Sequence, residues 1–550
     1  MPTIKLNKKV FEELVGKKLP LDQLKDRISM LGTDLESIEG NEINVEVFPN
    51  RPDMLSEQGF ARAFASFIGE KTGLRKYDVQ PSGAKVIIDK SVAGVRPFTA
   101  CAIVRELNFT DEKIKEIIQI QEKLHITFGR NRKKAAIGVY PLEHIKTPIT
   151  FFAEDPKKVK FQPLEFPKEI TALQVLSQHP AGKEYGHLLE GMNKISFFKD
   201  ATGSILSMPP IINSNTTGKI SEGTREVFVE CSGFDMDTLE KCLNMIVTAL
   251  ADMGGKVYSM ELEYPDKKLV TPNLEPEEME LDIDYINKRL GLQLSEKEIV
   301  KCLEKMGYGF NKGKALVPAY RADVLHQVDL AEDVAIAYGY ENFEHEIPHL
   351  STIGKESGFA VFKNKINNIL AGLGLIEVNT YHITSKNNQT SMMGLDIPLV
   401  ELENALNIEY SSMRAWIIPS IMEVLRSNKH NEYPQNLFNI GIVFKKDKSK
   451  ETNVKEDTRL AVALCGEDSD FTKIKQVFDY LLKQIDCSYE TAETDHPSFI
   501  PGRVARIAVN SKNIAYIGEI SPAILDNFDL QMPVAAFELN LSELYEINNK

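Results

Sequence analysis

One stretch of the 550-residue chain, Val317 to Glu341 (VPAYRADVLHQVDLAEDVAIAYGYE), constrains the local fold more tightly than any other. Pro318 has no backbone N–H donor and biases its neighbour towards extended geometry, so the run up to Asp323 is predicted to be non-helical. Apolar residues then recur at helical spacing from Asp329 onward, and Gly339 is the type of residue at which helices end. The stretch therefore predicts an extended segment followed by one helix.

The first turn of this predicted helix is acidic. Asp329, Glu332 and Asp333 stand at i, i+3 and i+4, so their side chains project from one face, and Asp323 lies on the incoming segment. Mg²⁺ prefers carboxylate oxygens, and four such groups could meet at one cation. Asp329 with Glu332 is also a helix N-cap with an acidic N3 residue, which the helix dipole favours. The spacing leaves both interpretations open.

Length and composition indicate a globular protein of several domains. Apolar residues make up 43% of the chain and charged residues 26%, which is ordinary for globular domains with real cores. The six cysteines are scattered without a CxxC pair, so reduced thiols are expected. Residues 1–10 lack the apolar core of a signal peptide, and no window has the 18 apolar residues of a membrane helix. We therefore expect a cytoplasmic protein with no membrane partner.

The net charge of −14 argues against general affinity for nucleic-acid backbones. If the protein handles RNA, the positive surface must be local or must come from a partner.

Helical and strand patterns mix along the chain and predict an α+β multidomain fold. We expect four modules: an N-terminal α/β module at 1–80, an α+β domain at 85–265, a third module at 270–346 that ends in the acidic helix, and a sheet-containing module at 355–550. Asp22 and Asp237 are predicted to open helices, as is Ser295 with Glu298. A similarity between 11–32 and 285–307 is too weak to indicate a repeat.

The stretch at 317–341 resembles the B5 domain of the β chain of phenylalanyl-tRNA synthetase, where a Pro-x-x-Arg-x-Asp run precedes an acidic helix ending in Tyr-Gly-Tyr. The matching residues are Pro318, Arg321, Asp323, Asp329, Glu332, Asp333, Tyr338, Gly339 and Tyr340. The resemblance implies a winged-helix-like domain whose four carboxylates hold Mg²⁺, in a site shared with the partner chain. The run from Asn50 to Ser56, which alone reads as a turn, resembles the N-R-P-D-x-L-S run near the start of the same β chains.

The last module is similar to the class II synthetase-like (B6/B7) module of these β chains, through residues that include Asn404, Tyr410, Arg414, Pro419, Phe438, Gly441, His496, Arg503 and Glu519. An active class II site needs one Arg for the ATP α-phosphate and another, after a Gly-rich strand, for the γ-phosphate. Arg414, Arg503 and Arg506 lie in contexts that predict structural roles. The resemblance likewise implies a non-catalytic antiparallel-sheet module, with ATP and phenylalanine bound by the α chain.

The second module resembles the B3/B4 editing domain, which hydrolyses tyrosine wrongly attached to tRNA. Tyr differs from Phe by a hydroxyl, so the pocket must carry a buried acceptor. The resemblance places pocket residues at Gln121, Arg132, Phe198, Ser207, Lys219, Glu230 and Ser232. Glu230 and Ser232 stand where relatives commonly have Asp and Thr. From the residues alone, Glu230 is a solvated strand end, and the two serines are turn or cap residues.

The resemblance identifies the chain as a β subunit of phenylalanine-tRNA ligase of the archaeal and eukaryotic cytosolic type. It implies an α2β2 assembly with an α subunit that performs ATP-dependent attachment of phenylalanine to tRNA(Phe), while the β chain contacts tRNA and edits Tyr-tRNA(Phe). Two alternatives remain open at this point, a free-standing hydrolase of mischarged tRNA and a scaffold whose editing pocket has decayed.

Overall fold

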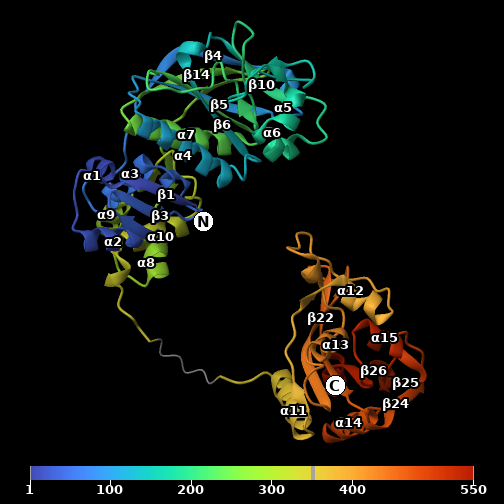
Figure 1. Ribbon diagram of the computed structural model, residues 1–550. Helices are drawn as coiled ribbons and strands as arrows, with labels where there is room; N and C mark the ends of the chain where they lie inside the picture. The colour runs from blue at the N-terminus through green and yellow to red at the C-terminus, as the bar shows by residue number, and fades with distance from the viewer. Residues whose placement is uncertain (1, 348–353, 549–550) are drawn as a thin grey trace. The chain divides into compact units, whose positions relative to one another are not determined.

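The computed structural model describes residues 2–347 and 354–548 and forms two compact units, Met1–Ile347 and Pro348–Lys550 (Figure 1). The first three predicted modules lie in the first unit, and the fourth lies in the second. Among the described residues, none of the helices combines the length and the apolar character needed to cross a bilayer. All six cysteines lie in the described ranges and are free thiols.

The N-terminal module packs helices on a three-stranded antiparallel sheet of order β1-β3-β2. Its elements are β1 (Thr3–Asn7), α1 (Lys8–Val15), α2 (Leu21–Met30), β2 (Asp34–Glu39), β3 (Glu42–Glu46) and α3 (Glu57–Phe67). Because no strand pair is parallel, this module is α+β rather than the expected α/β. The cap predicted at Asp22 is wrong, since α2 begins after Pro20 and Asp22 lies within its first turn.

The third module has the same element order and the same sheet order. Its elements are β16 (Glu277–Glu280), α8 (Ile283–Leu290), α9 (Glu296–Lys305), β17 (Gly309–Asn311), β18 (Lys314–Val317) and α10 (Gln327–Tyr338). The sheet order β16-β18-β17 matches β1-β3-β2. The similarity that is too weak to indicate a repeat in the sequence is therefore an internal repeat in the structure. The capping box of Ser295 and Glu298 at the start of α9 is confirmed.

Buried ion pairs join the two repeats. Arg51 and Asp53 form a bidentate pair after β3, and Arg321 and Asp323 form one at the corresponding place after β18 (Nε–Oδ1 2.9 and 2.8 Å). The charges of Arg321 and Asp323 affect the pKa of Arg51, and that of Arg321 affects the pKa of Asp53, so the two pairs lie close together. A small cavity of about 10 Å³ is lined by both arginines and by Arg62 of α3. The repeats therefore meet through charges that are shielded from water.

The middle domain is built on a ten-stranded mixed sheet. Its main path has the order β12-β11-β10-β7-β4-β14-β5-β13-β6, and β15 pairs with β14. The strands are β4 (Val79–Ile88), β5 (Phe98–Arg105), β6 (Ala135–Pro141), β7 (Ile149–Glu154), β10 (Ile195–Lys199), β11 (Ile205–Met208), β12 (Ile212–Asn213), β13 (Val227–Gly233), β14 (Lys256–Glu263) and β15 (Lys268–Thr271). Because β15 belongs to this sheet, the domain extends beyond the expected end at 265.

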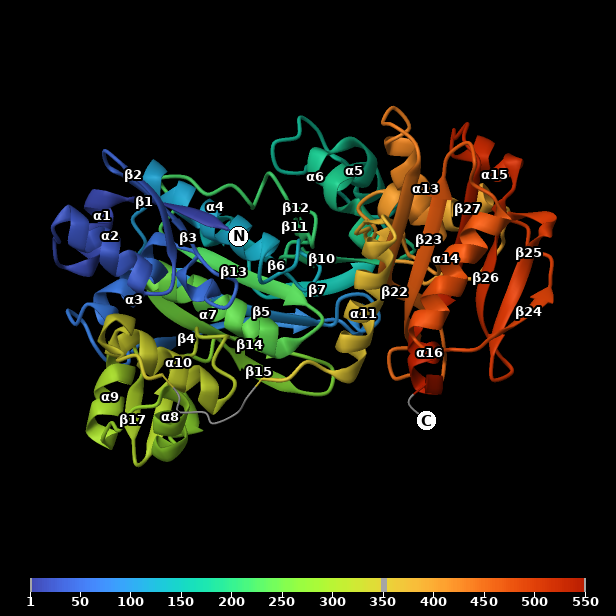
Figure 2. The same ribbon diagram turned by 90° about the horizontal axis from the view of Figure 1, so that it is seen from below.

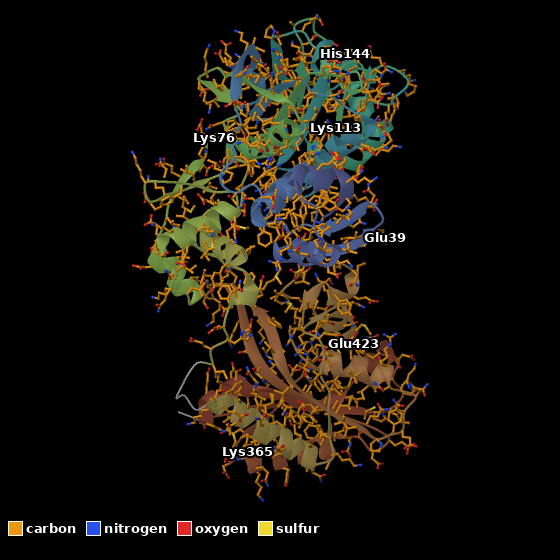
Figure 3. The ribbon with its side chains drawn as sticks, turned by 90° about the vertical axis from the view of Figure 1, so that its left-hand side faces the viewer. Glu39, Lys76, Lys113, His144, Lys365 and Glu423 are labelled. Atoms are coloured by element: carbon orange, nitrogen blue, oxygen red, sulfur yellow. The ribbon has the colours of Figure 1, made fainter. Side chains whose placement is uncertain are left out.

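Two helices, α4 (Asp111–Ile126) and α7 (Met236–Asp252), cover one face of this sheet on the side of the N-terminal module (Figure 1). Figure 3 labels Lys113 in the first turn of α4. Helix α7 is capped by Asp235, whose side chain accepts from the Thr238 N–H, and not by Asp237 as predicted. Asp252 at its C-terminus forms an ion pair with Arg62 of α3, with 2.7 Å between Asp252 Oδ2 and Arg62 Nη1. This pair joins the domain to the N-terminal repeat. The small helices α5 (Ala172–Gln178) and α6 (Pro180–Tyr185) lie apart from this layer.

The second unit is a seven-stranded sheet of order β19-β22-β23-β27-β26-β25-β24, antiparallel except for the pair β19–β22. The strands are β19 (Ile376–Glu377), β22 (Gln435–Lys446), β23 (Val454–Cys465), β24 (Glu490–Glu493), β25 (Phe499–Val509), β26 (Lys512–Ile520) and β27 (Val534–Asn540). Helices cover both faces (Figure 2). One core contains α11 (Gly358–Gly372), α14 (Phe471–Gln484) and α16 (Leu541–Asn548), and the other contains α13 (Ile418–Ser427) and α15 (Pro522–Asn527).

The buried ion pairs predict a local stability effect. Replacement of Arg321 by Leu leaves Asp323 and Asp333 buried without their cation, which we expect to destabilise the first unit by about 3–5 kcal/mol. Circular dichroism should show a lowered thermal transition, while the fluorescence of Trp416, the only tryptophan, reports the second unit and should not change. Lys256→Gln, which breaks an exposed pair with Glu106, is the control. If Arg321→Leu and Lys256→Gln have the same transition temperature, the structural role of Arg321 is contradicted.

Candidate functional site

A cavity of about 350 Å³ lies in the middle domain, where the two ends of the sheet approach each other. Strand β6 ends the sheet on one side and β12 on the other, and the Tyr140 hydroxyl oxygen of β6 lies 3.2 Å from Asn213 Oδ1 of β12. Helix α4 and the segment 209–220 complete the wall. The curvature of the sheet therefore creates an enclosed space from segments that are far apart in the sequence.

Glu230 lies in the middle of β13 and lines this cavity with only 2% of its surface exposed. Its Oε1 accepts a hydrogen bond from the Tyr140 hydroxyl at 3.1 Å, whereas the buried Oε2 has no partner. Burial raises the pKa of Glu230 to about 7, although the Tyr140 hydroxyl, the charge of Arg96 and the Ser232 hydroxyl oppose the rise. An unpartnered buried carboxylate oxygen is costly, so this group is suited to a ligand that supplies a hydrogen-bond donor.

Gly138 makes the contact between Tyr140 and Glu230 possible. Gly138 of β6 is the register partner of Glu230 in β13. A Cβ atom at position 138 would lie 2.2 Å from the Tyr140 hydroxyl oxygen, a distance at which a side chain would collide with the ring. The Tyr140 side chain therefore folds over Gly138 to reach the carboxylate.

Helix α4 binds the exposed edge of β6 through two side chains. Gln121 Nε2 donates to the Ile137 carbonyl at 2.8 Å, and the Ile137 N–H donates to His125 Nε2 at 2.8 Å. Burial lowers the pKa of His125, so the ring is neutral and its proton lies on Nδ1, which faces Glu122 Oε1 at 3.2 Å. The edge strand is thereby satisfied without another strand.

Arg132 fixes the opposite wall. Its Nη1 donates to the carbonyls of Pro210 and Ile211 at 3.2 and 2.9 Å, and its Nη2 pairs with Glu122 at 3.0 Å. The guanidinium also lies 4.2 Å from the Tyr185 ring centroid. One cation therefore connects α4, the segment 209–212 and α6.

Five of the seven predicted pocket residues line the cavity, namely Gln121, Arg132, Ser207, Lys219 and Glu230. Phe198 and Ser232 do not line it. Phe198 is fully buried and stacks on Phe151 of β7 with centroids 4.4 Å apart, because it belongs to the core of the sheet. Ser232 is also buried, and its hydroxyl accepts from Arg96 Nε at 3.1 Å.

The sequence reasoning missed Tyr140, His125, Glu122 and Asn213, all of which line the cavity or bind a residue that does. His125 stands four residues after Gln121, so the helical spacing of α4 was a usable signal. The segment 204–219, whose composition predicts a loop, contains β11 and β12. Nothing in the sequence signals that Asn213 meets Tyr140, because this contact depends on the curvature of the sheet.

Three of the four predicted magnesium ligands are already bound by other groups of the chain. Asp323 accepts both donors of Arg321, and Asp333 Oδ2 accepts from Arg321 Nη2 at 2.8 Å and from the Tyr308 hydroxyl at 2.5 Å. Asp329 Oδ2 accepts from the backbone N–H groups of Leu325 and His326. Within residues 2–347 and 354–548, no three His, Cys, Asp or Glu side chains are grouped for a metal ion. A magnesium site made by this chain alone is therefore not supported.

The alternative interpretation, with Asp329 as the N-cap and Glu332 as the N3 residue, is wrong because the helix begins three residues earlier. His326 is the N-cap of α10, and Asp329 is the N3 residue that completes the capping box. Glu332 is exposed, and burial together with the charges of Asp333, Asp329 and Asp323 raises its pKa.

The arginines of the second unit have structural partners, as predicted. Arg414 is 1% exposed and donates from Nε to the Ile442 carbonyl and from Nη1 to Thr380 Oγ1, at 2.8 and 2.7 Å. Arg503 pairs with Glu519 at 2.7 Å, and the Arg506 guanidinium lies 3.9 Å from the Tyr516 ring centroid.

The raised pKa of Glu230 predicts a pH-dependent stability. The native state holds the proton up to about pH 7, whereas the unfolded group loses it near the ordinary glutamate pKa of 4.5, so the stability of the first unit falls as pH rises through this window. Glu230→Gln should remove that fall, which amounts to roughly 3 kcal/mol at most. Thermal melting followed by circular dichroism between pH 4 and 8 measures the effect. The exposed Glu169→Gln is the control, and parallel pH profiles of wild type and Glu230→Gln would refute the assignment.

Comparison with known proteins gives the family. The family model described as phenylalanyl tRNA synthetase beta chain CLM domain matches residues 344–541, and the tRNA synthetase B5 domain matches 279–340. The chain is 39% identical to the phenylalanine–tRNA ligase beta subunit of Pyrococcus abyssi, over 99% of this chain and 100% of that protein. It is also 39% identical to the beta subunit of Thermococcus kodakarensis, over 99% of each.

A solved structure agrees with these matches. The crystal structure of an N-terminal fragment of the phenylalanyl-tRNA synthetase beta subunit from Pyrococcus horikoshii has a TM-score of 0.59 and 37% identity, and the match covers 61% of this chain and 99% of that chain. Because relatives well above 30% identity match over the full length, the chain belongs to the family of phenylalanine–tRNA ligase beta subunits.

Proposed function

We propose that the cavity at Glu230 is an editing site for Tyr-tRNA(Phe), in a B3/B4-like domain. The observation that supports this function is the unpartnered Oε2 of a carboxylate that is 2% exposed and lines a cavity of about 350 Å³. A tyrosyl hydroxyl supplies the donor that Glu230 lacks, whereas a phenylalanyl ring leaves the carboxylate buried and unpaired. Sites built to bind a hydroxyl in this way reject the analogue without it far better than apolar pockets do.

The charge state of Glu230 fits this role. With a pKa of about 7, the group is a strong acceptor in its ionised form at neutral pH and above. Tyr140 already occupies Oε1, which leaves Oε2 for the substrate. Part of the remaining wall is apolar, with Ile114, Ile117 and Ile118 of α4 among its residues. An aromatic ring with one polar end matches such a lining.

Hydrolysis at this site does not use a histidine base. His125 has its Nε2 lone pair occupied by the Ile137 N–H, and its Nδ1–H faces Glu122. We therefore propose a positioned water whose oxygen attacks the ester carbonyl carbon. The bond to the ribose oxygen breaks, the ribose oxygen takes a proton, and tyrosine and uncharged tRNA leave. The neighbouring ribose hydroxyl is suited to orient the water.

We further propose that this β chain works with an α chain in an α2β2 assembly in the cytoplasm. Arg414, Arg503 and Arg506 have structural partners, which supports ATP and phenylalanine binding on the α chain. The second unit exposes apolar side chains that a partner would cover: Tyr381, Leu406 and Ile408 are 79%, 102% and 87% exposed. We also propose that the third module is a winged-helix-like domain.

We propose magnesium binding only at a site whose ligands are shared with the partner chain. Glu332 is exposed and is surrounded by the charges of Asp333, Asp329 and Asp323. Oxygen ligands from the partner chain would have to complete the site, because Arg321 and backbone N–H groups already bind the three aspartates. Metal analysis of the assembled complex with Glu332→Gln tests this, and unchanged magnesium content would overturn it.

The editing role predicts a selective defect. Glu230→Ala removes the acceptor, so mischarged Tyr-tRNA(Phe) should persist while charging with phenylalanine continues, and deacylation should slow by about 10²-fold or more. Deacylation of purified Tyr-tRNA(Phe) by the α-containing complex measures the effect. Glu169→Ala, an exposed acid of the same domain, is the matched control. Unchanged deacylation by the Glu230 variant would refute the role.

Assembly predicts a second result. Leu406→Asp with Ile408→Asp places charges on the exposed apolar surface and should reduce co-purification of the α chain at least tenfold. Val270→Asp changes an equally apolar side chain, 61% exposed, in the first unit and is the control. If both variants retain the partner equally, this surface is not the interface.

One comparison separates the alternatives. Deacylation by the β chain alone indicates a free-standing hydrolase, deacylation only after α is added supports the editing subunit, and none in either case indicates a scaffold.

A further inference from the structure

A second cavity of about 370 Å³ adjoins the first in the middle domain. Arg132 lines both cavities and therefore forms part of the wall between them. The residues that give the second cavity its character are Val95, Arg96, Lys133, His187, Met192 and Phe234. None of its lining residues is acidic, and Arg96, Arg132 and Lys133 are cationic. In a chain with net charge −14, this is a local concentration of positive charge.

Arg96 is the buried charge of this cavity, with 4% of its surface exposed. Its Nε and Nη2 both donate to Ser232, at 3.1 and 2.5 Å. Within residues 2–347, no carboxylate forms an ion pair with it, and Glu230 acts on it only through its charge. Burial of a guanidinium without a counter-ion is costly. Burial accordingly lowers the pKa of Arg96 to about 10. The Arg96 guanidinium is therefore suited to bind an anion.

The turn that carries Arg132 and Lys133 has an unusual backbone. Arg130, Asn131 and Arg132 have positive φ angles of 49°, 52° and 64°. Three successive left-handed residues without glycine are strained, and such strain concentrates at ligand-binding sites. The turn places Arg132 between the cavities and leaves the Lys133 side chain exposed at the second one.

Phe234 adds an aromatic surface beside these cations. It follows β13 directly and is 49% exposed, and the Arg96 guanidinium carbon lies 5.4 Å from its ring centroid. An exposed aromatic ring next to arginine and lysine is the combination with which proteins bind single-stranded nucleic acid, through base stacking and phosphate contacts.

We propose that the second cavity binds the single-stranded 3′ end of the tRNA. A phosphate of the acceptor end pairs with Arg96 and Lys133, and a base stacks on Phe234. Since Arg132 borders both cavities, the esterified amino acid of the same end enters the first cavity, where Glu230 lies. This assignment rests on the editing function proposed above and names the part of its substrate that the second cavity holds.

Substitutions in the assembled αβ complex test the assignment. Lys133→Gln and Phe234→Ala should each raise the KM for deacylation of Tyr-tRNA(Phe) about tenfold or more, with kcat nearly unchanged. Arg96→Gln should raise the KM by a similar factor. Lys134→Gln, an exposed neighbour that does not line the cavity, is the matched control. Lys133→Gln should also reduce the slope of log KM against log salt by about 0.7, because one single-strand phosphate contact is lost. If Lys133→Gln matches Lys134→Gln, the proposal is overturned.

Direct binding separates this inference from the editing proposal. Cytidylyl-adenosine, which carries the terminal phosphate and two bases, should bind the wild-type complex and bind at least tenfold more weakly to Arg96→Gln and Phe234→Ala, by calorimetry. Inorganic phosphate should bind far more weakly than the dinucleotide. Equal binding of the two would indicate a free-anion site and would overturn the assignment. This measurement requires no deacylation. It therefore tests the second cavity even if Glu230→Ala leaves deacylation unchanged.

Discussion

The first unit depends on charges that are buried in pairs. Arg51 with Asp53 and Arg321 with Asp323 occupy equivalent places in two repeats of one fold, and they meet where the repeats pack. Arg62 extends the cluster to Asp252 at the end of α7. Each charge is tolerated in the interior because the others are present, and these charges join the three modules together with an apolar core that runs through all of them.

That arrangement explains why the carboxylates of the acidic turn are not grouped for a metal ion within the described residues. The carboxylates of Asp323 and Asp333 neutralise Arg321, and Asp329 caps its own helix. A cation would have to displace these partners. Spacing along a helix shows which side chains share a face. It does not show whether a buried arginine already forms ion pairs with those side chains.

The cavity of the middle domain depends on the curvature of its sheet. A mixed sheet that bends until β6 and β12 face each other produces a cavity whose wall comes from both ends of the sheet. Glu230 gains its raised pKa from this enclosure. The adjoining cavity at Arg96 shares Arg132 with it, so a cavity that holds a buried carboxylate and a cavity without acidic lining residues lie side by side. This is the combination that an aminoacyl ester on a polyanion requires.

The sequence by itself determined the family, the mixed helix and strand content and the cap of α9, because these follow from local patterns and motifs. Its resemblance to the family also named five residues that line the cavity. It could not place Phe198 and Ser232, since a residue on a strand can face a core or a cavity. It missed Tyr140, the repeat and the fate of the four carboxylates. Only the tertiary structure decided these, because burial, sheet curvature and competition among buried charges arise when distant segments meet.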